Sequence, residues 1–164
     1  MDRIKTQRKH GFSLLELVIV VVIMGIIAAI AIPRMSRGTA GAADSALSSD
    51  LAVLRNAIDL FAAEHGGKFP TDANLVNQLT QYTDDKNTTA PVATKDTTHI
   101  YGPYLREVPT LPVGANKGKT TFTATAPGAS AADAGWYYDE DTGTIKANCA
   151  DSEVDDSNTK YNEY

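Results

Sequence analysis

Two patterns of apolar positions follow one another along the first 65 residues of the chain. Residues 12–32 form a run of 21 positions in which Glu16 is the only charged side chain. At a rise of about 1.5 Å per residue, a helix of this length is roughly 31 Å long, which is about the thickness of the hydrocarbon core of a bilayer. We therefore predict a transmembrane helix over residues 12–33.

The second pattern is an apolar stripe at helical spacing. Large apolar residues recur at intervals of four, three, four and three positions, namely Leu47, Leu51, Leu54, Ile58 and Phe61. Gly66-Gly67 ends the pattern in the usual C-terminal manner, and Pro70 follows. We predict that the helix continues over residues 34–65 and that the stripe is the docking face for the remaining chain. A coiled-coil partner is the alternative.

Shorter patterns fill the rest of the chain. Residues 72–82 read as a short helix with Leu75, Val76 and Leu79 on one face, and Thr71 or Asp72 is suited to cap its start. Residues 82–100 are polar and rich in threonine, which is typical of an exposed loop, and prolines make residues 101–112 irregular.

Strand-forming residues come last. We predict a strand over residues 119–125 and then a hairpin, in which an aromatic run at 136–138 and a second strand through Ile145 flank an Asp-Thr-Gly turn. The fold class is thus α+β, with a long N-terminal helix packed against a small antiparallel sheet in the region 66–164.

Basic residues flank the apolar run unequally. Arg34 and Arg37 follow it, whereas four basic residues precede it, namely Arg3, Lys5, Arg8 and Lys9. The excess at the start predicts a cytoplasmic N-terminus, with the remaining chain outside the cytoplasm. A cleaved secretory signal is the competing interpretation, but such signals have an apolar core of only about 7–15 residues.

Composition argues against several function classes. The formal net charge is −5, which is unfavourable for nucleic-acid binding. The single cysteine, Cys149, excludes an internal disulfide and has no neighbouring histidine to activate it. His10 belongs to the basic leader, His65 is placed to interact with a helix C-terminal dipole, and His99 lies in a loop. We therefore predict no zinc site, no catalytic residue and no enzyme activity.

The start of the apolar run resembles a known processing signal. The stretch GFSLLE at residues 11–16, between basic residues and an apolar run, is similar to the class III signal of type IV pilins and type II secretion pseudopilins. The resemblance implies that residues 1–11 are a leader, that a prepilin peptidase cuts between Gly11 and Phe12, and that it methylates the new amino terminus of Phe12. It also implies that Gly25 and Pro33 loosen the helix.

For Glu16, the resemblance implies a role in filament assembly, by pairing with the N-terminal amine of a neighbouring subunit. A charged group at the centre of a membrane helix costs about 2.5–3.5 kcal/mol, so such groups usually have a partner. Cleavage would create one, the amine of Phe12, either in the same chain or in an adjacent one. The alternative is that Glu16 reaches the headgroups or is protonated there.

Two further stretches, GGKFPT at residues 66–71 and GPYLREVPTLP at 102–112, resemble the major pseudopilins. The implied molecule has a pilin-like fold and is a structural subunit of a type II secretion pseudopilus-like filament, anchored once in the bacterial inner membrane with its C-terminal domain in the periplasm. The implied partners are the prepilin peptidase, identical subunits, other pseudopilins, the inner-membrane assembly platform and the lipid bilayer, without nucleic acid. The alternatives are a type IV pilin for adhesion, motility or DNA uptake, and a tethered periplasmic binding module that does not polymerise.

The resemblance also raises the question of calcium, which major pseudopilins bind in a C-terminal loop through acidic and carbonyl oxygens. The acidic candidates are Asp139, Asp141, Asp151, Glu153, Asp155 and Asp156. They do not align with the family's ligand pattern, and the last 16 residues depart from it. We therefore expect a solvated acidic tail and no resident metal or cofactor, with calcium as the alternative.

Overall fold

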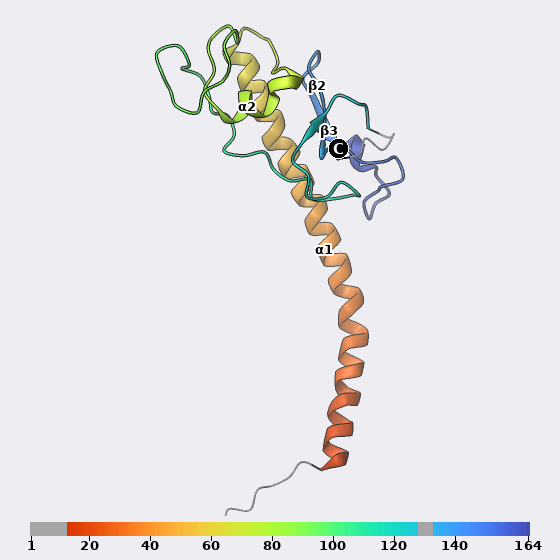
Figure 1. Cartoon of the computed structure of the whole chain (residues 1–164). Coiled ribbons are helices and arrows are strands. Elements are labelled where there is room, and N and C mark those ends of the chain that lie inside the picture. The colour runs from red at the N-terminus through yellow and green to blue at the C-terminus, as the bar shows by residue number, and fades with distance from the viewer. Residues whose placement is uncertain (1–12, 128–132) are drawn as a thin grey trace, which may run out of the picture. The chain divides into compact units, whose positions relative to one another are not determined.

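The structure is a computed structural model that describes residues 13–127 and 133–164, with the backbone alone over 30–40. Its elements are, in chain order, α1 (Leu14–Glu64), the 3₁₀ helix η1 (Asp72–Asn74), α2 (Leu75–Thr80), β1 (Phe122–Thr123), β2 (Trp136–Asp139), β3 (Thr144–Ala147) and the 3₁₀ helix η2 (Tyr161–Glu163) (Figure 1). The chain divides into two units, residues 1–39 and 40–164, and α1 contributes to both.

The predicted long helix is confirmed for the described residues. The backbone of α1 is helical without interruption through Gly25 and Pro33. It ends where two glycines adopt positive φ angles, 66° at Gly66 and 84° at Gly67. The amide of Gly67 donates to the carbonyl of Ala62 at 2.8 Å, which closes the last helical turn.

The apolar stripe of α1 forms the core of the unit 40–164. Its five members are at most 1% exposed: Leu47, Leu51, Leu54, Ile58 and Phe61. They pack with buried side chains from the rest of the unit, including Leu79, Leu111, Trp136, Tyr138 and Ile145. Burial of five such side chains contributes roughly 7–15 kcal/mol, comparable to the whole stability of a small domain. The stripe is therefore the docking face within this chain, and the coiled-coil alternative is wrong.

The second helix differs from its prediction in length and in the face that it buries. Residues 72–80 form η1 and α2, and α2 buries Leu75, Gln78 and Leu79, whereas Val76 is exposed. Thr71 occupies the N-cap position of η1 but makes no capping bond with its side chain. Its amide instead donates to Oε1 of Gln78 at 2.8 Å, so a distant side chain satisfies the helix start.

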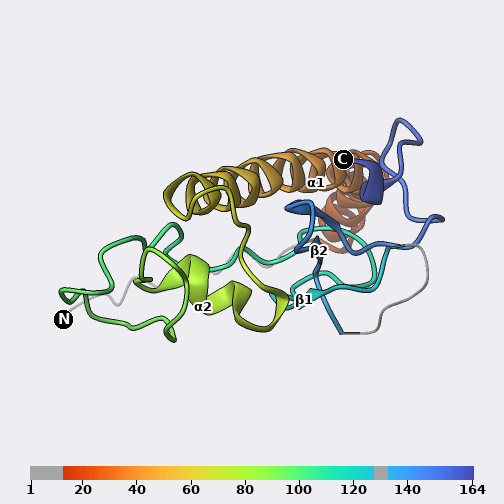
Figure 2. The same cartoon turned by 90° about the horizontal axis from the view of Figure 1, so that it is seen from above.

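The sheet is small and mixed rather than antiparallel as predicted. β2 and β3 form the expected antiparallel hairpin, with Trp136 opposite Ala147. β1, however, covers only Phe122–Thr123 and pairs with β2 in parallel, with Phe122 opposite Trp136. Figure 2 shows α2 and β1 on the same side of the part of α1 that follows residue 40. The prediction failed because strand direction depends on how the connection between β1 and β2 returns, which composition does not encode.

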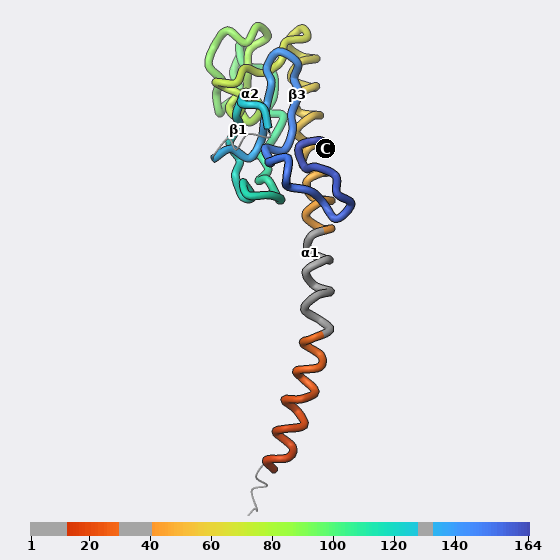
Figure 3. Tube along the Cα trace, turned by 90° about the vertical axis from the view of Figure 1, so that its right-hand side faces the viewer, coloured from red at the N-terminus to blue at the C-terminus, as the bar shows by residue number. Residues whose placement is uncertain are grey.

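The C-terminal segment, residues 148–164, is folded, while Asp151, Asp156 and Glu163 within it are exposed as expected for a solvated acidic tail. Val154 and Lys160 form an isolated antiparallel bridge, and η2 follows. Nη2 of Arg55, on α1, donates to the main-chain oxygen of Tyr164 at 2.6 Å. In Figure 3 this segment, in blue near the label C, lies beside the part of α1 that follows residue 40. Its backbone polar groups are satisfied by local bonds and by side chains rather than by water alone.

Candidate functional site

Glu16 lies in the first turn of α1 and is exposed. Just before it, the side chain of Ser13 accepts the amide of Leu15 at 3.3 Å, which satisfies one of the free donors at a helix start, and its carbonyl accepts the first helical bond, from Leu17 at 3.2 Å. An anion is favourable at this end because the helix dipole is positive there. The carboxylate is thus placed at a helix N-terminus.

The side chains before and after Glu16, from Leu14 to Ile27, form an apolar surface on all sides of the helix. Each large apolar side chain is at least 45% exposed: Leu14, Leu15, Leu17, Val18, Ile19, Val20, Val21, Val22, Ile23, Met24, Ile26 and Ile27. A helix that is apolar all round belongs in an apolar surrounding, such as lipid or other protein. Among the described residues, no helix meets both the length and the apolar content needed to cross a membrane.

The other predicted assembly residues are described only in part. Gly11 and Phe12, the predicted cleavage and methylation positions, lie outside the described residues, so their pairing with Glu16 stays a prediction. A side chain added at Gly25 would meet no atom within 4 Å. Helix loosening at Gly25 and Pro33 was predicted for the filament and stays a prediction, while α1 of the single chain is continuous there.

His65 is a buried structural residue at the end of α1, only 3% exposed. Its Nδ1 lies 2.8 Å from the carbonyl of Phe61, which also accepts the backbone amide of His65 at 3.0 Å. Its Nε2 lies 3.0 Å from Oγ1 of Thr83, and its ring stacks on Phe61 with centroids 3.9 Å apart. Both ring nitrogens are thus engaged, in keeping with the predicted role at the helix end.

A hydroxyl, an imidazole and a carboxylate meet in the loop 82–101, which sequence reasoning missed. Oγ1 of Thr89 lies 2.8 Å from Nε2 of His99, and Nδ1 of His99 lies 2.9 Å from Oδ2 of Asp96. The amides of Thr98 and His99 both donate to Oδ1 of Asp96 at 2.7 Å. These bonds, the backbone bond from His99 first, hold the pKa of Asp96 at about 2.

This arrangement has the order of a hydrolytic triad, but neighbouring amides of the same loop are already hydrogen-bonded to carboxylates. A triad works with free N–H groups that stabilise an oxyanion. Here the amides of Thr98 and His99 donate to Asp96, and the amide of Thr88 donates to Asp84 at 2.9 Å. Thr89, His99 and Asp96 therefore stabilise the conformation of the loop. The sequence does carry a signal for these bonds. Each aspartate is followed two to four residues later by threonine or histidine, a spacing typical of local bonds from a side chain to the backbone.

The acidic residues of the C-terminal segment accept hydrogen bonds from protein donors. Glu153 accepts the amides of Ala115 at 2.5 Å and Ala150 at 2.7 Å. Burial, followed by the nearby carboxylate of Glu153, raises the pKa of the Cys149 thiol to about 12. Cys149 is therefore unsuited to act as a nucleophile.

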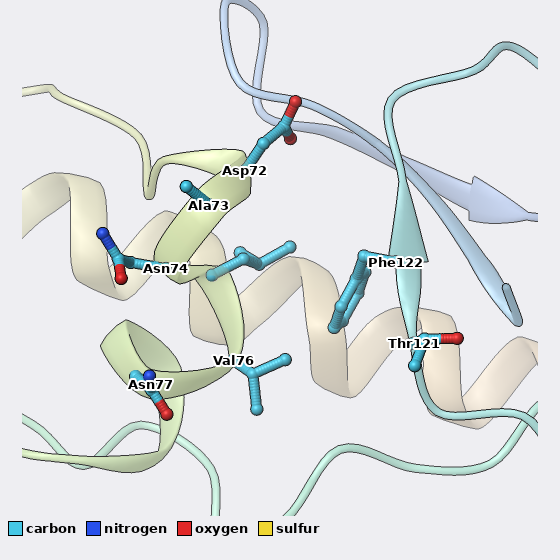
Figure 4. Close-up of a pocket in the computed structure, with 8 residues that line it drawn as sticks. Asp72, Ala73, Asn74, Val76, Asn77, Thr121 and Phe122 are labelled. Carbon is cyan, nitrogen blue, oxygen red and sulfur yellow. The ribbon is translucent and has the colours of Figure 1, made fainter.

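A small open pocket lies between η1, α2 and β1. Its volume is about 210 Å³, and Figure 4 shows Val76 and Phe122 facing its centre, with Asp72 at one edge. Burial, followed by the charges of Glu140, Asp139 and Asp141, raises the pKa of Asp72. The pocket is smaller than most small-molecule sites, which measure about 300–1,000 Å³, and it contains none of the predicted site residues.

Comparisons with known proteins decide the family. The family described as the prokaryotic N-terminal methylation motif matches residues 6–32, the region of the predicted cleavage signal. The type II secretion system core protein G of Aeromonas hydrophila is 30% identical over 108 residues, which cover 66% of this chain and 70% of that protein. The chain belongs to the type II secretion core protein G family.

Other members of the core protein G family support this assignment. The protein of Klebsiella pneumoniae is 29% identical over 67% of this chain and 73% of its own length. That of Vibrio cholerae serotype O1 is 27% identical over 67% of this chain and 69% of its own length. No solved structure matches the chain. Membership confirms the resemblance to the major pseudopilins that the signal and the two proline-containing stretches indicated.

Proposed function

We propose that this chain is a structural subunit of a type II secretion pseudopilus-like filament. The observation that carries the proposal is the methylation motif over residues 6–32 in a chain whose relatives are named core proteins of this secretion system. The all-round apolar surface of α1 supports it, because such a surface must be covered by lipid before assembly and by other subunits afterwards.

The proposed processing prepares the assembly residue. A prepilin peptidase cuts between Gly11 and Phe12 and methylates the amine of Phe12. The cut leaves the apolar run on the mature chain, and residues 12–33 anchor that chain once in the inner membrane. The C-terminal domain then lies in the periplasm. The new cation pairs with Glu16 of a neighbouring subunit, which removes the penalty of an unpaired carboxylate in an apolar surrounding and fixes the register between subunits. Loosening of the helix near Gly25 and Pro33 accompanies packing in the filament.

The proposed partners follow from this role. They are the peptidase, identical subunits, other pseudopilins, the inner-membrane assembly platform and the lipid bilayer. The function is mechanical rather than catalytic: the engaged ring nitrogens of His65 and His99, and the raised thiol pKa of Cys149, support this inference. The net charge of −5 disfavours binding to nucleic acid.

The test combines the mature N-terminus with a variant series. Mass spectrometry of the protein produced with its peptidase is expected to give a chain that begins at Phe12 and carries one methyl group. Glu16→Ala is expected to abolish sheared filaments while cleavage proceeds. Asp59→Ala is the matched control, since it removes an exposed carboxylate from the other part of α1.

Three outcomes would redirect the proposal. A mature chain that begins at Met1 or beyond Arg34 would overturn the processing step. A processed chain that stays monomeric would indicate the tethered binding module. Long surface filaments that support adhesion, motility or DNA uptake, with no defect in secretion on deletion, would indicate a type IV pilin.

A further inference from the structure

We propose that this chain closes its C-terminal loop with the carboxylate of Glu153 in place of the calcium ion that the major pseudopilins use. The inference concerns the stability of the domain and does not depend on the proposed filament. It rests on the hydrogen bonds that the carboxylate oxygens of this segment already accept from protein donors.

Glu153 joins three parts of the chain. Oε1 accepts the amide of Ala115 at 2.5 Å, and Oε2 accepts the amide of Ala150 at 2.7 Å. Its own amide donates to the carbonyl of Ala150 at 2.9 Å, and its carbonyl accepts the amide of Tyr161 at 3.1 Å. A carboxylate that accepts two backbone amides makes two charge-assisted bonds, which are stronger than neutral ones. The side chain thus ties the loop at 114–116 to Ala150, while the backbone carbonyl of the same residue holds Tyr161.

Two other acidic residues of this segment, Asp155 and Asp151, are occupied in ways that a cation would have to undo. Oδ1 of Asp155 accepts the amides of Ser157 and Thr159, each at 2.8 Å, and Oδ2 accepts the hydroxyl of Tyr164 at 2.6 Å. Oδ1 of Asp151 accepts Nδ2 of Asn162 at 2.8 Å. These bonds aim N–H and O–H donors, rather than oxygens, at the carboxylates.

A positive side chain already stands in this segment. Nζ of Lys160 lies 3.3 Å from Oδ2 of Asp151 and 3.5 Å from Oε1 of Glu163. An ammonium group between two carboxylates repels a divalent cation and competes for the same oxygens.

The carboxylate of Asp139, on the β2–β3 turn, is engaged as well. Asp139 accepts the amide of Asp141 at 3.0 Å and the hydroxyl of Thr142 at 2.8 Å. Calcium takes six to eight oxygen ligands. Within residues 13–127 and 133–164, no three acidic, histidine or cysteine residues are grouped so that they could hold a metal ion. Residues 128–132, which complete the connection between β1 and β2, contain no carboxylate. The residues present therefore do not fit a calcium site.

Cys149 offers a direct measure of whether this loop is closed. It is the single cysteine of the chain, it is 2% exposed, and its thiol and the Glu153 carboxylate both lie against Gly114. A maleimide can reach this thiol only when the segment opens. The labelling rate of Cys149 in the native protein therefore reports the population of the open loop.

The experiment uses the full chain in detergent micelles. Labelling is measured in wild type, in Glu153→Asp, and in Glu107→Asp as a control with an exposed carboxylate. Glu153→Asp keeps the charge beside the thiol but is one methylene shorter, so it cannot bridge both amides. We expect it to label about tenfold faster or more, because a charge-assisted bond is lost. The control is expected to label at the wild-type rate.

A second measurement tests the metal directly. The labelling rate and the melting temperature of wild type are determined in EDTA and in millimolar calcium chloride, and both are expected to be equal in the two conditions. Slower labelling or a higher melting temperature in calcium, reversed by EDTA, would overturn the proposal in favour of a metal site. Wild-type labelling of Glu153→Asp would overturn the role of Glu153. If this variant does not fold, the comparison of calcium with EDTA still decides whether a metal ion closes the loop, and Glu153→Gln, which keeps the side-chain length, tests the carboxylate. Filament formation enters neither readout, so a failure here leaves the proposed function standing.

Discussion

The ring of Phe69 packs directly against Gly143, the glycine of the turn between β2 and β3. A Cβ atom at Gly143 would lie 2.5 Å from Cε1 of Phe69. Gly143 also has a φ of +68°, a backbone conformation that side chains disfavour. The turn is therefore restricted twice, by its own conformation and by a residue that follows the long helix.

This contact predicts a difference between two glycine substitutions. Gly66→Ala places a Cβ in open space at a similar φ of +66°, so it should lower the free energy of unfolding by about 1 kcal/mol through backbone strain alone. Gly143→Ala should lower it by roughly 1–3 kcal/mol more, because the phenylalanine must move. Chemical denaturation of both variants measures the difference. An equal loss of unfolding free energy in both variants would mean that the ring of Phe69 moves aside at no energetic cost.

The buried stripe of α1 predicts a second pair of variants on the same helix. Leu54 is 0% exposed, whereas Leu60 is 52% exposed. Leu54→Ala should lower the free energy of unfolding by about 2–5 kcal/mol through lost burial and the cavity left behind. Leu60→Ala should change it by no more than about 0.5 kcal/mol. Differential scanning calorimetry compares the two, and a similar loss at both sites would contradict the packing described for α1.

The loop 82–101 predicts a pH dependence in acid. The bonds from His99 and Thr98 hold the pKa of Asp96 at about 2, below its value of about 3.9 in an unfolded chain. A lowered carboxylate pKa favours the folded loop fully above pH 4, and this contribution is lost as the pH falls toward 2. Nuclear magnetic resonance should show the amide signals of Thr98 and His99 titrating with a midpoint near pH 2.

The controls for this titration are two aspartate substitutions. Asp96→Asn should remove the acid transition from both amide signals, whereas Asp141→Asn, on the distant β2–β3 turn, should leave it in place. A midpoint near pH 4 in wild type would show that the hydrogen bonds from His99 and Thr98 do not persist in solution.

Local patterns predicted the parts of the fold that local physics determines. The spacing of Leu47 through Phe61 gives the buried face of α1 because a helix repeats every 3.6 residues, and Gly66 marks its end because positive φ suits glycine. The hairpin of β2 and β3 follows from an aromatic run and a glycine turn close together in the chain. These signals are contained within a few residues.

Contacts between distant segments were not predictable in the same way. The parallel pairing of Phe122 with Trp136 depends on the return path of the connection between them. The bond from Ala115 to Glu153 spans 38 positions, so an acidic segment looked like a solvated tail. At the assembly end, the role of Glu16 came from the resemblance and from the energetics of a lone charge, and it stays a prediction.

The indole of Trp136 has a consequence for anyone who wishes to watch this molecule at work. It is the single tryptophan of the chain, it is fully enclosed, and its Nε1 donates to the carbonyl of Pro109 at 2.9 Å. Its emission therefore originates from one junction, where the proline-containing segment lies against β2. Without any attached dye, a red shift during polymerisation would show that this junction opens to water, and an unchanged spectrum would show that subunits join as preformed bodies.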